Sequence, residues 1–228
     1  MKVEFDSLGE SAMLVRPAGV RAAGDAATRA VLSVCERLRA ARISGVRELA
    51  PAPTTVAIFY DPAELPLDEL QRCVLDALAK VPAGRQRSRP PVVEIPVCYG
   101  EEFGPDLRDV ASHARRSPSE VVACHSAAKY RVGCIGFTPG FPYLTGLPAA
   151  LTTPRRSTPR ARVAAGSVAI GGAQAGIYPA DSPGGWNVIG RTPLRLFEIE
   201  REPPSLLRVG NEVRFRAITR AEFDALNR

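Results

Sequence analysis

The chain of 228 residues is long enough for one large domain or two small ones, and 45% hydrophobic with 24% charged residues indicates a globular, ordered protein. Thirty basic and 24 acidic residues leave a net charge of +6, and arginine supplies 27 of the basic residues. No secretory signal pattern is present, and glycine and proline interrupt the longest uncharged runs, so we expect a cytoplasmic protein without a membrane span.

The first eighty residues predict a compact α/β unit. Short strands are expected at 3–5, 12–15, 46–49 and 55–60, and helices over 22–42 and 67–81. In the first helical segment, Val31, Val34 and Leu38 recur at helical spacing. Two helices interleaved with four strands predict a ferredoxin-like split α/β sandwich for residues 1–84.

The segment AGRQRSRPP at 83–91 is polar and basic and ends in two prolines, which is typical of a domain linker. After it, a strand is expected at 92–99 and helices over 107–115 and 118–128. Ser117 fits the N-cap of the second of these helices, because Pro118 suits the first helical position and Glu120 completes a capping box.

From residue 130 onward, short β-like segments alternate with glycine and proline. The expected strands are 131–135, 167–170, 176–178, 187–189, 194–199 and 212–217, followed by a helix over 220–226. Many short strands separated by turn residues predict a barrel or sandwich for the domain at 92–228. Five cysteines without a CxxC pair indicate reduced thiols and no zinc site.

The positive charge is concentrated between His125 and Phe197. This stretch has a net charge of +7, with Asp181 as its one acidic residue, whereas the rest of the chain has a net charge of −1. Its basic residues are Lys129, Arg131, Arg155, Arg156, Arg160, Arg162, Arg191 and Arg195. Because acidic neighbours are missing from this stretch, an anion-binding site and a solvated basic surface are both open interpretations.

Three segments rich in glycine and proline lie in this basic stretch. The first, GFTPGFPYLTGLP at 136–148, predicts either a rigid wall for a small ligand or a buried turn that closes a barrel. Its candidate binding residues are Phe137, Pro139, Gly140, Phe141 and Tyr143.

The second segment, PRRSTPRARVAAGSVAIGG at 154–172, contains Pro-Arg twice. Proline restricts the backbone before Arg155 and Arg160, and arginine forks bind carboxylate and phosphate in two-point geometry. If Arg160 and Arg162 lie in a strand, they point to the same face.

The third segment, GIYPADSPGGWNVIGRTP at 176–193, begins near Tyr178 and ends near Arg191. Gly184 and Gly185 would allow backbone N–H groups to converge on an anion. Trp186, the only tryptophan, is predicted either to cover a ligand or to be a core residue.

His125 ends a predicted helix just before the aromatic segment at 136–148, which we call the aromatic loop. A structural role and a general acid–base or substrate-binding role are both open for it. A Ser182, His125 and Asp181 triad has no support in the spacing. The sequence contains no P-loop, GxSxG or HExxH motif, and no GxGxxG follows a predicted strand.

Taken in order, the three segments resemble the signature of the family of 5-oxoprolinase B subunits, also called KipI-like or allophanate hydrolase subunit 1. The resemblance runs from about His125 to Phe197 and departs from the family where proline is expected at Ala164 or Ala165. It implies a ferredoxin-like domain followed by a cyclophilin-like β-barrel. It also implies ATP-dependent opening of 5-oxo-L-proline to L-glutamate, together with a KipA-like C subunit plus a LamB/YcsF-like A subunit.

The resemblance further implies ATP as a co-substrate with Mg²⁺, no resident metal or prosthetic group, and no nucleic acid or membrane partner. A lactam is a poor electrophile, and phosphorylation of its carbonyl oxygen would require cationic donors, for which Arg155, Arg160 and Arg191 are expected. His125, Arg160 and Ser182 are the catalytic candidates, His125 as the group that moves a proton. The predicted substrate or nucleotide contacts are Phe137, Pro139, Gly140, Phe141, Tyr143, Arg155, Tyr178, Gly184, Gly185, Trp186 and Arg191.

Two alternatives come from other classes of protein. The KipI-like branch implies an inhibitor that binds a sensor histidine kinase, with the barrel as a protein-binding module. The related domains of biotin-dependent urea carboxylase imply carboxyl transfer to a urea-like acceptor.

Overall fold

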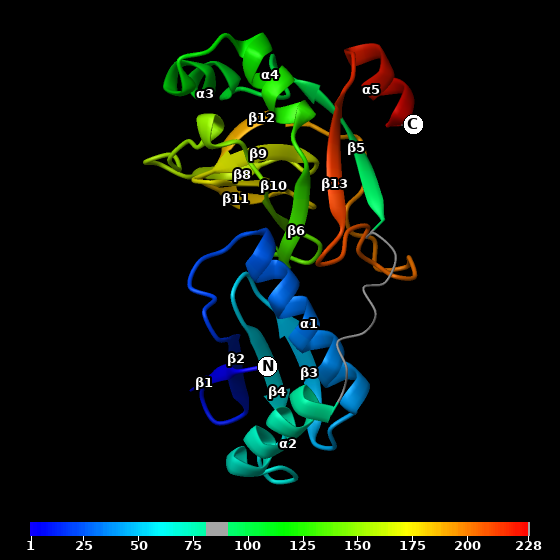
Figure 1. The fold of residues 1–228 in the computed structure, drawn as a ribbon. Coiled ribbons are helices and arrows are strands. Elements are labelled where there is room, and N and C mark those ends of the chain that lie inside the picture. Colours follow the sequence, from blue (N-terminus) through cyan, green and yellow to red (C-terminus); the bar gives the residue numbers. More distant parts are fainter. Residues whose placement is uncertain (81–90, 228) are drawn as a thin grey trace. The chain divides into compact units, whose positions relative to one another are not determined.

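The computed structural model describes residues 1–80 and 91–227 (Figure 1). The chain divides into two compact units, Met1–Pro90 and Pro91–Arg228. The linker predicted at 83–91 lies outside the described residues except for Pro91. In the described ranges, no helix has the length and apolar character needed to cross a membrane.

The N-terminal unit is a four-stranded antiparallel sheet with two helices. Its elements are β1 (Val3–Ser7), β2 (Ala12–Pro17), α1 (Asp25–Ala41), β3 (Val46–Pro51), β4 (Val56–Tyr60) and α2 (Leu67–Lys80). Val31, Val34 and Leu38 of α1 pack against the sheet, as their spacing predicts. The helix begins at Asp25, three residues later than expected, because Gly24 before it has an extended backbone.

The strand order of this sheet is β1-β2-β4-β3. The chain order is ββαββα, and moving β1 to the end of the chain would produce the βαββαβ order of a ferredoxin-like split sandwich. The α+β fold class predicted for this unit is therefore confirmed. The strand that comes last in the ferredoxin-like order comes first in this chain, as β1.

The C-terminal unit is a closed barrel with the strand order β10-β7-β6-β13-β5-β12-β9. Its strands are β5 (Val92–Tyr99), β6 (Tyr130–Ile135), β7 (Pro142–Thr145), β9 (Ser167–Gly171), β10 (Gln174–Ile177), β12 (Asn187–Arg191) and β13 (Glu212–Ala217). The pair β5–β13 is parallel and the other pairs are antiparallel, so the barrel is mixed. A separate two-stranded ribbon joins β8 (Arg160–Val163) to β11 (Ser182–Gly184).

Helices α3 (Leu107–Ala114) and α4 (Pro118–Ala127) cover one end of the barrel (Figure 1). Val110 and Val121 from these helices are fully buried in the same core as the inward side chains of the strands. The capping box predicted at Ser117 is confirmed, because its Oγ accepts the Glu120 N–H and Glu120 accepts the Ser117 N–H at 2.7 Å. A short 3₁₀ helix, η1 (Ala149–Leu151), and the C-terminal helix α5 (Arg220–Leu226) complete the unit.

The strand predicted at 194–199 is wrong. This segment folds back on residues 203–206, where the Leu206 N–H donates to Leu196 O and the Glu198 N–H donates to Pro204 O. One isolated bridge, Phe197 to Ser205, remains. The alternating apolar pattern of residues 194–199 is thus satisfied by a loop that folds on itself. Proline in this loop prevents a longer ladder of hydrogen bonds between strands.

Candidate functional site

Four outward-facing positions form a continuous row across the barrel wall. Tyr143 of β7 lies opposite Gly176 of β10, Gly176 lies opposite Ala169 of β9, and Ala169 lies opposite Val188 of β12. The residues on either side of the two middle positions, Val168 and Ile170 in β9 and Ala175 and Ile177 in β10, belong to the barrel core, because side chains alternate along a strand. The small residues in the middle of the row leave space on the outer face of the barrel.

Five aromatic rings gather on this outer face. We call Phe137, Phe141, Tyr143, Tyr178 and Trp186 the aromatic cluster. Phe141 is central: its ring centroid lies 4.9 Å from that of Tyr143, 5.2 Å from that of Tyr178 and 5.7 Å from that of Trp186. The last two contacts are edge-to-face, the arrangement that aromatic quadrupoles favour.

Glycine is required beneath two of these rings. A Cβ at Gly171 would lie 2.4 Å from the Trp186 ring, and a Cβ at Gly184 would lie 2.3 Å from the Tyr178 hydroxyl oxygen. Gly184 was expected to bind an anion, but its position beneath Tyr178 explains its lack of a side chain by packing alone. Trp186 is 6% exposed, so it belongs to the core of this cluster.

The adjacent glycines 184 and 185 give a paired prediction. Gly184→Ala is expected to lower the free energy of unfolding by about 1–3 kcal/mol, since its Cβ would overlap Tyr178. Gly185→Ala is expected to change it by less than about 0.5 kcal/mol, because its Cβ would meet Pro159 at an ordinary 3.5 Å. Urea unfolding followed by Trp186 fluorescence measures both, and equal effects would contradict the packing role of Gly184.

The aromatic loop presents one ring to solvent. Phe137 is 60% exposed and has a φ of 68°, a left-handed conformation that is uncommon for a residue with a side chain. Pro139 is exposed beside it, whereas Gly140 is buried and a Cβ there would lie 2.7 Å from Cβ of Phe197. Phe141 is buried, so Phe137 and Pro139 are the parts of this loop that a ligand or another chain can reach.

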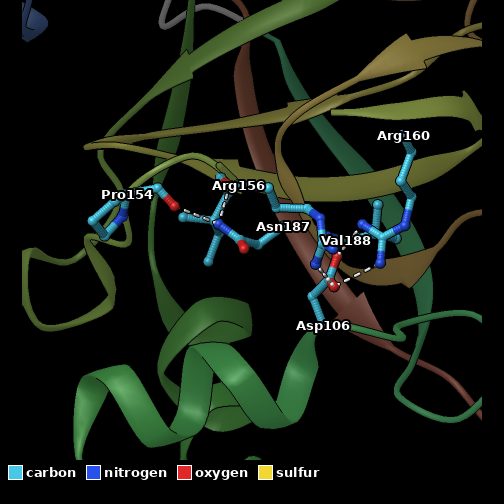
Figure 2. A network of polar contacts seen from close by, with 7 residues as sticks. Asp106, Pro154, Arg156, Arg160, Asn187 and Val188 are labelled. Atoms are coloured by element: carbon cyan, nitrogen blue, oxygen red, sulfur yellow. Dashed lines mark hydrogen bonds and ion pairs between the residues drawn. The ribbon is translucent and has the colours of Figure 1, made fainter. Parts of the chain in front are cut away.

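Two arginines of the basic stretch bind a buried carboxylate, Asp106 (Figure 2). Arg160 donates two hydrogen bonds of 2.7 Å to it and Arg156 donates one of 2.8 Å. These bonds to Asp106 raise the pKa of Arg160 above its usual value. The interpretation that the arginines lack an acidic partner is therefore corrected, because the partner lies about fifty residues earlier in the chain.

Arg155 differs from Arg156 and Arg160, which bind Asp106. It is exposed, and its guanidinium carbon lies 5.8 Å from the centroid of the Trp186 ring. In the described part of the chain, no carboxylate forms an ion pair with it. Arg155 is thus the guanidinium at the aromatic cluster that is free to bind an anion.

The remaining polar candidates lie around the ribbon. Arg162 donates to Asp181 at 2.8 Å, and Asp181 also accepts the Ala165 N–H at 2.8 Å, which is the main reason that its pKa is lowered. Arg191 donates through Nε to the Ala165 carbonyl at 2.7 Å. Ser182 Oγ is buried and has no hydrogen-bond partner among the described residues. Asp181 is thus engaged with Arg162 and the backbone, so it does not complete a triad with Ser182.

His125 lies in the barrel core, apart from the aromatic cluster. It is 0% exposed, its Nδ1 is 2.8 Å from the Tyr99 hydroxyl, and its ring centroid is 4.5 Å from that of Phe215. Burial lowers its pKa to about 3, so the ring is neutral at physiological pH. We therefore assign His125 a structural role and not the transfer of a proton to substrate.

The buried imidazole predicts a pH-dependent stability. When the protein unfolds, the pKa of His125 returns to about 6.5, so protons bind the unfolded chain preferentially between that pH and about 3. Stability falls as the pH drops through this window, by about 2 kcal/mol between pH 7 and pH 5. Urea unfolding at both pH values checks this, and a His125→Gln variant should lose about 2 kcal/mol less than the wild type. The same loss in both proteins would contradict it.

Phe137 and Arg155 are exposed, whereas Phe141, Tyr178 and Trp186 are buried beneath them in the aromatic cluster. Three hollows in the described surface lie elsewhere, and none is lined by Arg155 or a cluster residue. Within residues 1–80 and 91–227, no group of three or more histidine, cysteine, aspartate or glutamate side chains is arranged to hold a metal ion. The five cysteines are free thiols.

Comparison with known sequences gives consistent matches. The family model described as carboxyltransferase domain, subdomain C and D, matches residues 3–207. The 5-oxoprolinase B subunit of Bacillus subtilis (strain 168) is 38% identical over 235 residues, covering 99% of this chain and 97% of that protein. The protein of the same name from Escherichia coli O157:H7 is 47% identical over 174 residues, covering 75% of this chain and 77% of that protein.

Solved structures share the fold. The structure of TTHA0988 has a TM-score of 0.77 and 39% identity over 91% of this chain, which spans 39% of that longer protein. A conserved uncharacterized protein from Pyrococcus horikoshii has a TM-score of 0.58 and 36% identity, covering 96% of this chain and all of that one. Urea carboxylase of Kluyveromyces lactis has a TM-score of 0.76 at 18% identity, over 98% of this chain and 22% of that protein, a likeness of fold alone.

Proposed function

Because this chain belongs to the family of 5-oxoprolinase B subunits, we propose that it is one subunit of an enzyme that opens 5-oxo-L-proline to L-glutamate with hydrolysis of ATP. The observation that carries the proposal is 38% identity to a curated 5-oxoprolinase B subunit over 97% of its length. Two exposed side chains support it, the Phe137 ring and Arg155, which forms no ion pair with a carboxylate in the described part of the chain, since the substrate is a small ring that bears a carboxylate.

The lactam carbonyl is a poor electrophile and needs activation. Transfer of the terminal phosphoryl group of ATP to the carbonyl oxygen forms an O–P bond and releases ADP. Water then adds to the ring carbon, the C–N bond breaks with a proton passing to nitrogen, and a second water releases phosphate. Phosphoryl transfer and the two additions of water build negative charge on oxygen, which fixed cationic donors stabilise.

In this proposal, Arg155 binds the substrate carboxylate or the transferring phosphoryl group, and Phe137 packs against the ring of the lactam. Arg191 keeps its outer guanidinium nitrogens available for a second anion, because its Nε is held by Ala165. The Ser182 hydroxyl, buried and without a hydrogen-bond partner among the described residues, offers a further polar contact. Arg160 is bound to Asp106, so we assign it to the support of the site.

We propose that ATP enters with Mg²⁺ bound to its phosphates. The donor set on this face is cationic and aromatic, which suits the phosphates and not the metal. The ion would therefore be carried by the nucleotide or held by a different chain of the enzyme.

Phe137 and Arg155 are exposed to water, so a site built on them would need another chain to close it. The relatives are named as B subunits, which indicates an enzyme of several subunits. We propose that a KipA-like C subunit is the neighbour that covers the aromatic cluster, and that a LamB/YcsF-like A subunit is the third component. Exclusion of water around the activated lactam would then depend on assembly.

Coexpression with the subunits encoded beside this chain tests the proposal. The purified complex should hydrolyse ATP in response to 5-oxoproline, and this chain alone should not. Two parallel assays test the alternative functions. Urea with bicarbonate replaces 5-oxoproline in the first, and inhibition of a sensor histidine kinase is measured in the second. ATP hydrolysis that responds to urea but not to 5-oxoproline, or inhibition of the kinase without any lactam-dependent activity, would overturn the proposal.

A further inference from the structure

Asp106 has no role in the function proposed above, yet it is the most highly connected carboxylate of the site. We infer that Asp106 is a positioning residue: it fixes residues 154–163, which we call the arginine segment, against the barrel and so holds Arg155 over Trp186. The kinetic part of this inference rests on the proposed function, whereas its conformational part does not.

Asp106 is tied to the barrel on both its main chain and its side chain. It precedes α3, and its N–H donates to the Val188 carbonyl at 2.9 Å. Its Oδ2 accepts the Val188 N–H at 2.7 Å, so both polar groups of that strand residue are bound by one aspartate. The carboxylate is consequently fixed relative to β12, which begins one residue after Trp186.

The same carboxylate binds the arginine segment at two points. Arg156 reaches Oδ1, and Arg160 reaches both oxygens in two-point geometry (Figure 2). Together with Val188, this makes four hydrogen bonds, which occupy all the acceptor positions of a carboxylate. Asp106 therefore has no lone pair left to act as a general base, and its side chain is only 2% exposed.

Arg155 lies between anchored residues. The Pro154 carbonyl before it accepts Asn187 Nδ2 at 2.8 Å (Figure 2). After it, the Arg156 N–H donates to the Gly185 carbonyl at 2.8 Å, and the Arg156 side chain is held by Asp106. The backbone of Arg155 is thus restrained on both sides, which directs its guanidinium over the Trp186 ring.

Loss of the Asp106 charge would release this arrangement. The side chains of Arg156 and Arg160 are 31% and 28% exposed, so without a carboxylate they can turn into water. The arginine segment would then retain only its backbone contacts and the ribbon, and Arg155 would spend less time over Trp186. In Asp106→Asn, an amide NH₂ replaces one carboxylate oxygen. This donor would face the N–H donors of the guanidinium groups or of Val188, and those hydrogen bonds would be lost.

The first experiment uses the full chain without substrate. Trp186 is the only tryptophan, so acrylamide quenching of its fluorescence reports the cover over this one ring. Asp106→Asn is expected to raise the quenching constant at least about twofold, with an unchanged far-UV circular dichroism spectrum. Asp109→Asn, which changes an exposed aspartate in the first turn of α3, is the matched control and should quench as the wild type does. If Asp106→Asn does not fold, Arg156→Gln, which leaves Arg160 on the carboxylate, should give a smaller rise.

The second experiment uses the assembled enzyme. Asp106→Asn is expected to lower kcat/KM for 5-oxoproline by about tenfold or more, but to have little further effect in an Arg155→Ala background. A residue that only stabilises the fold would reduce activity by the same factor in both backgrounds. Unchanged quenching in Asp106→Asn, or effects of the two substitutions that multiply, would overturn the inference. Raised quenching in a complex that lacks oxoprolinase activity would refute the proposed function and leave the conformational role standing.

Discussion

Replacing Arg155 with alanine is expected to lower kcat/KM of the assembled enzyme by about 10- to 150-fold, which corresponds to the loss of one hydrogen bond to a charged group, about 1.5–3 kcal/mol. The physical reason is that Arg155 has no carboxylate partner in the described ranges, so its charge is available to an anionic substrate. The fold should be unaffected, because the side chain is exposed.

Steady-state assays on the complex, with 5-oxoproline and ATP varied in turn, measure this effect and show which ligand Arg155 binds. Arg155→Lys should recover only part of the rate, because an ammonium group lacks the two-point geometry of guanidinium. Arg208→Ala removes an exposed arginine elsewhere in the same unit and should leave the rate unchanged. A wild-type rate in Arg155→Ala would remove this residue from the site.

Phe141→Ala is expected to produce a large loss of stability, about 3–5 kcal/mol. Phe141 is 2% exposed and its ring contacts the four other members of the aromatic cluster, so truncation would leave a cavity that its neighbours cannot fill without moving. Urea unfolding, followed by Trp186 fluorescence and circular dichroism, gives the change in the free energy of unfolding.

Phe137→Ala is the matched control for Phe141. It removes a ring of the same size from the same loop, but one that is 60% exposed, so we expect a stability loss below about 1 kcal/mol. Because Phe137 is the ring proposed to contact the lactam, its variant should instead weaken the response to 5-oxoproline. Equal losses of stability in the two variants would contradict the assignment of Phe141 as a buried packing residue and Phe137 as an exposed ligand contact.

Much of the fold follows from local patterns in the sequence. Helices α1 and α2 were predicted from apolar spacing, and the start of α4 from its capping box, which follows from Ser117 and Glu120 alone. The strand predicted at 194–199 failed because its alternation is satisfied within a loop, a contact of short range that no periodicity can distinguish from a sheet. Strands β7 and β11 were missed because they are short and contain proline or glycine, which mark turns, and β8 was considered only as a possible strand holding Arg160 and Arg162.

The site was predicted in part. The aromatic residues and Arg155 were proposed from the unusual composition of their segments, and the structure brings them together. Asp106 was missed because it lies outside the basic stretch in the sequence, and only folding brings its carboxylate into contact with Arg156 and Arg160. Placement of His125 beside the aromatic loop rested on proximity in the sequence, and the helix instead turns its ring into the barrel core.

We propose that this chain supplies part of the lactam site of an assembled oxoprolinase. The most direct test of this claim measures glutamate and ADP formed by the purified subunits, with this chain present or omitted. We predict that glutamate and ADP appear in equal amounts when 5-oxoproline and ATP are supplied, and that neither forms when this chain is left out. Formation of glutamate at an undiminished rate by the other subunits alone would contradict the claim.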